Sequence, residues 1–101
     1  MQATIQSIHF DADHSLKSFV QEKVTKLDQF YENILSKEVI LKKENSDSDK
    51  GSIFEIKLRV PSQTLIATET ASTFEEATDK GLDNMVRQLK KFKDKQRTIR
   101  V

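Results

Sequence analysis

The sequence has no cysteine among its 101 residues, and only one proline and two glycines. Without cysteine the chain can form no disulfide framework, no thiolate metal site and no cysteine nucleophile. Long hydrophobic runs are also missing, since the longest are three residues, at 39–41 and 65–67. A membrane-spanning helix needs about 20 apolar residues, and residues 1–7 have neither the basic nor the apolar region of a secretory signal. We therefore expect a soluble cytoplasmic protein.

The charges are separated along the chain, although the net charge is only +1. Residues 1–85 carry 10 Lys and Arg against 15 Asp and Glu, whereas residues 86–101 carry seven against one. Basic residues near a helix C-terminus interact favourably with the helix dipole, but seven cations in 16 residues exceed what that effect requires. The basic block favours a surface that binds phosphate groups over a merely solvated helix face.

The spacing of apolar residues predicts six elements in the order strand, helix, three strands, helix. Asp13 is expected to cap the first helix, Thr73 and Glu76 to form a capping box at the second, and residues 6–7 to form a bulge in the first strand. The polar segment 44–51 is expected to be a loop. The predicted elements are a strand at 5–10, a helix at 13–31, strands at 38–43, 54–60 and 64–70, and a helix from 73 to about 95.

This order predicts an α+β fold, a two-layer sandwich with β-α-β-β-β-α topology. A helix joins the first two strands, so they should be parallel, whereas the short connections of the last three predict an antiparallel meander. Each helix has one apolar face, so both should cover the same face of the four-stranded sheet. We expect a single domain over residues 1–95 and a short C-terminal tail at 96–101.

Two groups of lysine and arginine stand out on the predicted helices. On the second helix, a basic row lies opposite the apolar stripe and should be exposed: Lys80, Arg87, Lys90, Lys91 and Lys95. On the first helix, Lys23 falls inside the apolar arc, with Lys26 beside it. Either Lys23 extends its head out of an apolar surface to reach water, or the seam between the two helices is open and electropositive.

Catalytic and metal-binding patterns are weak. His9 and His14, with Asp11 and Asp13, lack a recognised ligand spacing, and segment 45–56 departs from the calcium-loop pattern at the glycine and at the final glutamate position. There is no glycine-rich phosphate loop and no convincing Ser/His/Asp set. We expect no enzyme activity, no metal, no cofactor and no small-molecule substrate.

The run at 87–95, Arg-Gln-Leu-Lys-Lys-Phe-Lys-Asp-Lys, follows Ala77-Thr78-Asp79 and Asp83-Asn84. With Met1-Gln2, Ile5 and the segment from Leu16 to Leu27, these residues resemble the ribosome hibernation-promoting factor family, which includes ribosome-associated inhibitor A (protein Y) and is also called the sigma-54 modulation protein family. The resemblance covers residues 1 to about 95. Departures from the family pattern are Glu69, Ala71 and Gly81.

The resemblance implies a fold like that of double-stranded RNA-binding domains with an extra first strand. It also implies binding to rRNA of the small ribosomal subunit, in the channel used by mRNA and by A- and P-site tRNA, by a bacterial stress-response or stationary-phase protein. The chain ends at Val101, so we expect it to lack the dimerisation domain of long members, and a separate ribosome-dimerising factor is a further candidate partner. The family's rRNA-contacting positions correspond to Lys23, Lys26, Arg87, Lys90, Lys91, Lys93 and Lys95.

The function predicted from the sequence is therefore that of a non-enzymatic translation inhibitor, a ribosome hibernation factor that blocks tRNA and mRNA binding by occupancy. Two alternatives remain. A general double-stranded RNA-binding module would bind any long A-form duplex by its shape. A protein-interaction module would use the basic helix to dock an acidic partner, with weak salt dependence.

Overall fold

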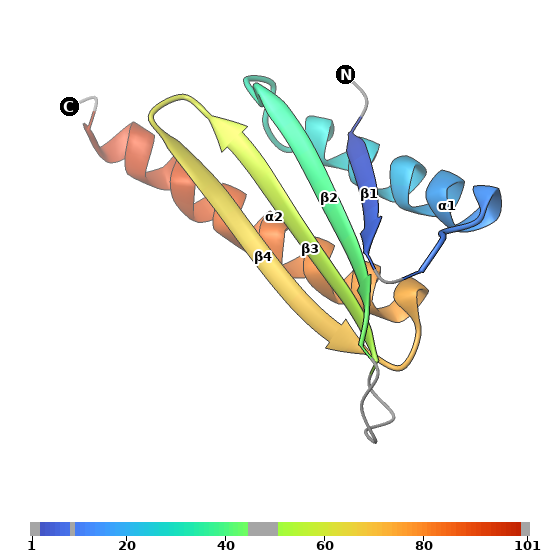
Figure 1. Ribbon diagram of the computed structural model, residues 1–101. Helices are drawn as coiled ribbons and strands as arrows, with labels where there is room; N and C mark the ends of the chain where they lie inside the picture. Colours follow the sequence, from blue (N-terminus) through green and yellow to red (C-terminus); the bar gives the residue numbers. More distant parts are fainter. Residues whose placement is uncertain (1–2, 9, 45–50, 100–101) are drawn as a thin grey trace.

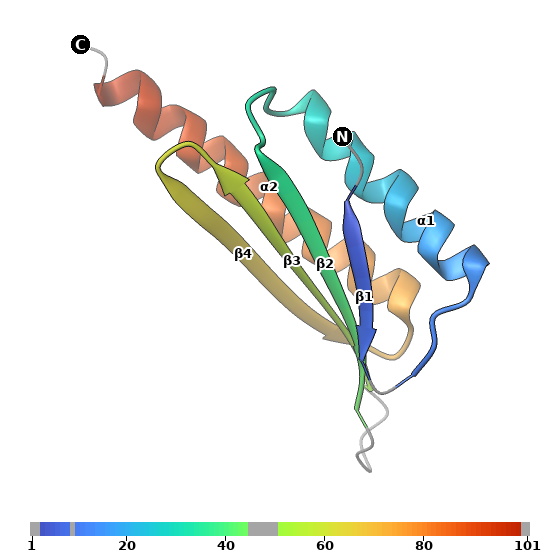
Figure 2. The ribbon, with the colours of Figure 1, turned by 45° about the horizontal axis from the view of Figure 1, so that its top comes forward.

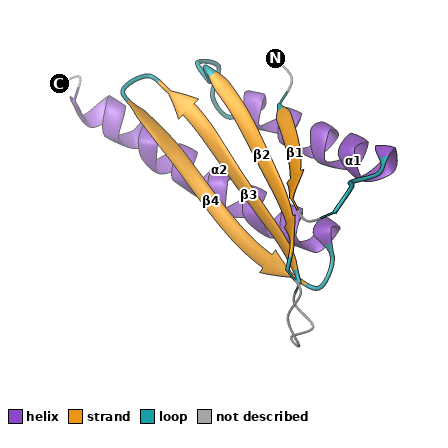
Figure 3. Ribbon diagram, viewed as in Figure 1, coloured by secondary structure: helices purple, strands orange, loops and turns teal. Residues whose placement is uncertain are grey.

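Four strands form one sheet, and two helices pack on one of its faces (Figure 1 and Figure 3). The computed structural model describes residues 3–8, 10–44 and 51–99, with side chains described as far as residue 95. The strand order is β1-β2-β3-β4, which confirms the predicted two-layer α+β sandwich. The elements are β1 (Thr4–Ile8), α1 (His14–Thr25), the 3-10 helix η1 (Lys26–Gln29), β2 (Ser36–Lys43), β3 (Ser52–Val60), β4 (Gln63–Ala71) and α2 (Phe74–Ile99).

Strand β1 is parallel to β2, and the other neighbours are antiparallel, as predicted. The β1–β2 register runs without interruption from Thr4 opposite Glu38 to Ile8 opposite Lys42, so the predicted bulge at 6–7 is wrong. The apolar residues of this segment depart from strict alternation for a different reason. Ile8 lies on the face of the sheet that the helices do not cover, and Phe10 lies beyond the end of β1. His9 and the loop segment 45–50 lie outside the described residues.

Strand β3 supplies the centre of the core. Its alternate residues Phe54, Ile56, Leu58 and Val60 are at most 3% exposed, which confirms the predicted buried face. Gly81 of α2 lies directly against Phe54, because a Cβ atom at Gly81 would be only 2.6 Å from Cε2 of the ring. The glycine that departs from the family pattern thus lets α2 approach the sheet closely.

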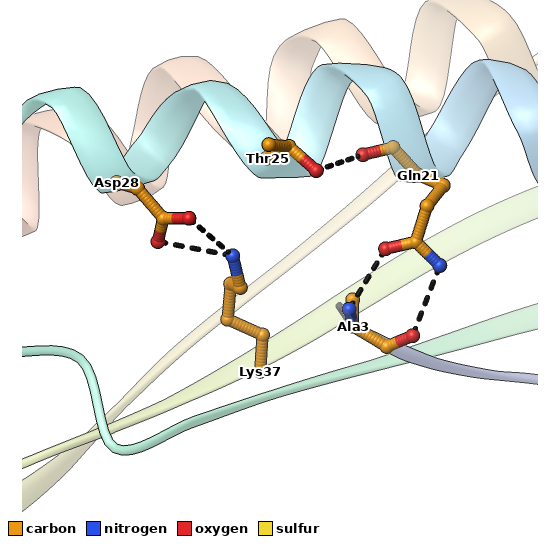
Figure 4. Close-up of polar contacts among 5 residues, drawn as sticks. All are labelled: Ala3, Gln21, Thr25, Asp28 and Lys37. Carbon is orange, nitrogen blue, oxygen red and sulfur yellow. Dashed lines mark hydrogen bonds and ion pairs between the residues drawn. The ribbon is translucent and has the colours of Figure 1, made fainter. Parts of the chain in front are cut away.

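The first helix begins where the sequence predicts but ends earlier. The Leu16 N–H donates to the Asp13 carboxylate at 2.8 Å, which confirms the cap. Helix α1 ends at Thr25 and continues as η1, so the α-helix predicted to residue 31 is too long. The ammonium of Lys37, buried on β2, lies 3.0 Å from both carboxylate oxygens of Asp28 and holds η1 against the sheet (Figure 4).

A side chain of α1 also fixes the start of β1. Gln21 accepts a hydrogen bond from the Ala3 N–H at 2.7 Å and donates one to the Ala3 carbonyl at 3.0 Å (Figure 4). The Gln21 side-chain amide therefore pairs with both the N–H and the carbonyl of Ala3, as the backbone of a neighbouring strand would. This pair sets the position of the edge strand relative to the helix layer.

Helix α2 extends past the β3–β4 hairpin and ends near the described C-terminus (Figure 1 and Figure 2). The Glu76 N–H donates to the Thr73 hydroxyl at 3.1 Å, which confirms the Thr73 half of the predicted capping box, whereas the Glu76 carboxylate accepts from the Ser72 hydroxyl at 3.3 Å. The helix continues to Ile99, past the end predicted near residue 95. Within residues 3–8, 10–44 and 51–99, no helix is both long and apolar enough to cross a membrane.

Candidate nucleic-acid interface

The exposed cations of α2 follow from the way the helix packs. Met85, Leu89 and Phe92 face the sheet and are at most 5% exposed. The opposite side of the same turns is therefore turned to solvent. It carries four exposed cations, which we call the basic end of α2: Arg87, Lys90, Lys91 and Lys95.

The charges of the basic end are not neutralised by a described neighbour. Among residues whose side chains the structure describes, the ion pairs are Lys23 with Asp79, Lys37 with Asp28, and Lys80 with Glu76. None of these involves the basic end. Positive charge that is in none of these ion pairs can attract an external anion, and neutralising phosphates there would release bound counterions.

The basic end also has a neighbour on its β4 side. Lys91 and Lys95 line a shallow hollow together with Gln63 and Leu65 at the start of β4. Gln88 also lines this hollow, and its side-chain amide donates to the Ile66 carbonyl at 2.8 Å. Lys91 and Lys95 therefore lie beside the start of β4, close to the β3–β4 hairpin.

Lys93 is held more firmly than the sequence predicts. Its ammonium donates to the Phe30 carbonyl at 2.9 Å, and the side chain is half-buried. Next to it, the rings of Tyr31 and Phe92 pack edge to face with centroids 5.4 Å apart. Lys93 thus ties α2 to the segment after η1, and its role in binding RNA remains a prediction.

The seam between α1 and α2 is open, but it is not uniformly electropositive. Lys23 and Lys26 line the hollow together with Asp79 and Asp83. The Lys23 ammonium lies 3.9 Å from the Asp79 carboxylate and 5.5 Å from the centre of the Phe19 ring. The Lys23 ammonium therefore lies in the seam, between the face of an aromatic ring and a carboxylate.

The two helices run in the same direction along the sheet (Figure 2). Lys23, in the last turn of α1, pairs with Asp79 near the start of α2, and the Phe30 carbonyl meets Lys93 further along α2. Helix α1 therefore ends beside the first half of α2, and each helix dipole favours cations near the C-terminus of its own helix. The fold brings Lys23 and Lys26 to the seam and Lys93 to its continuation beside Phe30, whereas Lys91 and Lys95 lie on the β4 side of α2.

Two polar links between elements are not predicted by the sequence. The Glu69 carboxylate accepts from the Asn84 side-chain amide at 3.1 Å, and the Oδ1 atom of Asn84 accepts from the Gln88 side-chain amide at 2.9 Å. Glu69, a departure from the family pattern, thus joins the β4 edge to α2. The buried Lys37–Asp28 pair is the other link. Lysine side chains are rarely buried. Nothing in the sequence therefore indicated that Lys37 would lie in the core and pair with Asp28. Across the described residues, no three His, Asp or Glu side chains could hold a metal ion.

Comparison with known proteins agrees with this architecture. A curated relative from Pseudomonas putida, ribosome hibernation promoting factor, is 28% identical over 99 residues, which cover 98% of this chain and 93% of the relative. The N-terminal domain of Thermus thermophilus protein Y superposes with a TM-score of 0.77 at 20% identity, covering 91% of this chain and 99% of that chain. A ribosomal subunit interface protein from Coxiella burnetii superposes with a TM-score of 0.81 at 17% identity, covering 93% and 99%.

These structural neighbours share the fold. The family model described as Sigma 54 modulation protein / S30EA ribosomal protein matches residues 3–97, which include both helices, the whole sheet and the basic end. The chain therefore belongs to the Sigma 54 modulation protein / S30EA ribosomal protein family.

Proposed function

We propose that this protein is a ribosome hibernation factor that binds rRNA of the small ribosomal subunit at the decoding channel and blocks tRNA and mRNA by occupying their place. Family membership and the name of the Pseudomonas putida relative support a role on the ribosome. A protein acting in this way works in the cytoplasm, without catalysis and without a cofactor. A separate ribosome-dimerising factor remains a candidate partner.

The observation that carries the proposal is the basic end of α2. Four exposed cations lie on two turns of a helix whose opposite side is locked into the core, so they are presented as one rigid surface. Binding phosphates by such a surface orders the four side chains but requires no ordering of the backbone. With Lys26 as a fifth contact, log affinity should fall with log salt with a slope near −4.

The shape of the domain supports inhibition by occupancy. Its principal extents are 51 × 26 × 18 Å, and the basic end of α2 lies along the long direction (Figure 1). A long, narrow body can fill a channel lined by rRNA while its basic side faces the phosphates. The tRNA and mRNA would then be excluded sterically, with no conformational change required in this protein.

The decisive experiment is co-sedimentation with purified small ribosomal subunits over a salt series. The test variant changes Arg87, Lys91 and Lys95 to Glu, which should leave the melting temperature nearly unchanged, since exposed substitutions shift stability by about 0.5 kcal/mol or less each. The same substitutions should abolish pelleting with the subunits, because three attractive contacts with phosphates become repulsive. A variant that melts normally and still pellets would contradict the proposal.

A matched control makes the same change in net charge elsewhere. Changing Lys17, Lys42 and Arg59 to Glu alters α1, β2 and β3 but leaves α2 intact. This control should still pellet with the subunits. Equal loss in both variants would show that only the overall charge matters. Tight binding of a long RNA duplex in place of the subunit would favour the general double-stranded RNA-binding module, and salt-insensitive binding of a protein would favour the acidic-partner module.

A further inference from the structure

Phe30 is an exposed aromatic residue inside the proposed RNA-binding surface. Its side chain is 36% exposed, and the other large exposed hydrophobic residues of the described chain, Leu35 and Ile66, lie outside the seam. The Phe30 N–H donates to the Leu27 carbonyl at 3.0 Å, and its own carbonyl accepts from Lys93 at 2.9 Å. The backbone is thus held on both sides, and the ring is presented at a defined position.

Phe30 separates two hollows. On one side lies the seam, with the apolar side chains of Leu27, Leu82 and Val86 among its lining. On the other side lies a hollow formed by the segment 29–33 together with Lys93. A flat group entering either hollow would therefore meet the aromatic ring.

The charges of the seam indicate which part of an RNA fits there. Asp79 and Asp83 balance Lys23 and Lys26, and Lys23 already lies near Asp79. A phosphate inside the seam would meet two carboxylates as well as two ammonium groups and would gain no net attraction. A nucleobase carries no charge, has a flat face for the ring, and has amino groups that carboxylates can accept hydrogen bonds from.

We propose that the seam receives an unpaired base of rRNA, which stacks on Phe30 while the exposed lysines contact the neighbouring phosphates. This inference rests on the proposed binding to the small subunit and deepens it. The basic end contributes binding affinity that does not depend on the RNA sequence. The seam adds a contact that requires a base outside a duplex, which distinguishes an irregular rRNA surface from a regular A-form helix.

The first test measures affinity for small subunits. Phe30→Ala should weaken binding about 5- to 150-fold, the range found when an aromatic side chain under a stacked base is removed. The slope of log affinity against log salt should not change, because no phosphate contact is lost. Phe30→Leu keeps an apolar side chain but should also weaken binding, whereas Phe30→Trp should bind at least as tightly as the unmodified chain.

The matched control is Leu35→Ala, because Leu35 is more exposed than Phe30 and lines neither hollow. It should bind as the unmodified chain does. If Phe30→Ala also binds normally while the triple Glu variant of α2 does not, the stacking inference is wrong and the proposed function stands. If the unmodified chain does not bind small subunits at all, both are wrong.

The second test identifies what lies on the ring. The chain has no tryptophan, so Phe30→Trp introduces a single reporter, and the unmodified chain bound to subunits provides the background signal. Stacking on a base should quench the reporter, whereas Leu35→Trp should show little change. A photo-crosslinking phenylalanine analogue at position 30 should attach to rRNA. Attachment to a ribosomal protein instead would overturn the inference.

Discussion

Replacing Gly81 with alanine tests how closely α2 packs on the sheet. The added Cβ would lie 2.6 Å from Cε2 and 3.5 Å from Cγ of the Phe54 ring, whereas carbon atoms in contact are normally about 3.5–4.0 Å apart. Relieving the clash requires a shift on the order of 1 Å. Phe54 is fully buried, so the ring has no free space to move into, and the helix must yield instead.

The expected change combines two opposing effects. Overpacking a close-packed core costs about 1–3 kcal/mol, and alanine gains about 0.5–1 kcal/mol over glycine inside a helix. Gly81→Ala should therefore lower the free energy of unfolding by about 1 kcal/mol. For a domain of this size, that lowers the melting temperature by about 4–8 °C.

Thermal and chemical melts measure the effect, with Lys80→Ala as the control on the exposed side of the same helix. That control should shift stability by about 0.5 kcal/mol or less. Adding Phe54→Leu to Gly81→Ala should restore part of the loss, so the two substitutions should couple by more than 0.5 kcal/mol. A Gly81→Ala protein that is more stable than the original would refute the close approach, because helix propensity alone would then decide the outcome.

Four further predictions address the polar links and the function. Asp28→Ala should lower the free energy of unfolding by about 2 kcal/mol, because the buried Lys37 ammonium loses its partner. This loss is smaller than for a fully enclosed pair, since Asp28 is partly exposed. Lys37→Met, which replaces the charge with an apolar side chain, should cost less. Gln21→Ala should cost about 1–2 kcal/mol and speed hydrogen exchange in β1, since the backbone of Ala3 loses two hydrogen bonds; unchanged exchange would contradict the anchoring role. Lys91→Ala should make the salt slope of subunit binding shallower by about one unit; an unchanged slope would place this lysine outside the phosphate contacts. Pre-bound protein should weaken P-site tRNA binding to small subunits, and tRNA should weaken binding of the protein by the same factor; independent binding of both would exclude the occupancy mechanism.

The fold could be predicted wherever the information was local. The alternation of Phe54, Ile56 and Leu58 indicated a strand with one buried face, and the apolar stripe of the last helix indicated which side faces the sheet. The caps at Asp13 and Thr73 are formed within one helical turn, so short sequence patterns were sufficient. Topology followed from the order of the elements and the lengths of their connections.

The end of the first helix could not be predicted in this way. No glycine or proline marks it, and the apolar spacing continues smoothly to Phe30 and Tyr31. The α-helix ends at Thr25 and the chain continues as η1, which the contact between Asp28 and Lys37, nine residues apart and on different elements, joins to β2. Phe30 follows η1 directly and is exposed.

In the candidate site, too, some features follow from the local sequence and others depend on tertiary contacts. Helical periodicity by itself determined that Arg87, Lys91 and Lys95 lie opposite the core, because 3.6 residues per turn places them there whatever the helix packs against. Only the tertiary structure decided that Lys93 is held by a carbonyl 63 residues away, that Lys23 meets a carboxylate across the seam, and that Gly81 gives room to a phenylalanine ring. Periodicity orients a side chain about its own helix, but the atoms it meets depend on the distance between elements. That distance is set by the packing of the whole core and is not written in any one segment.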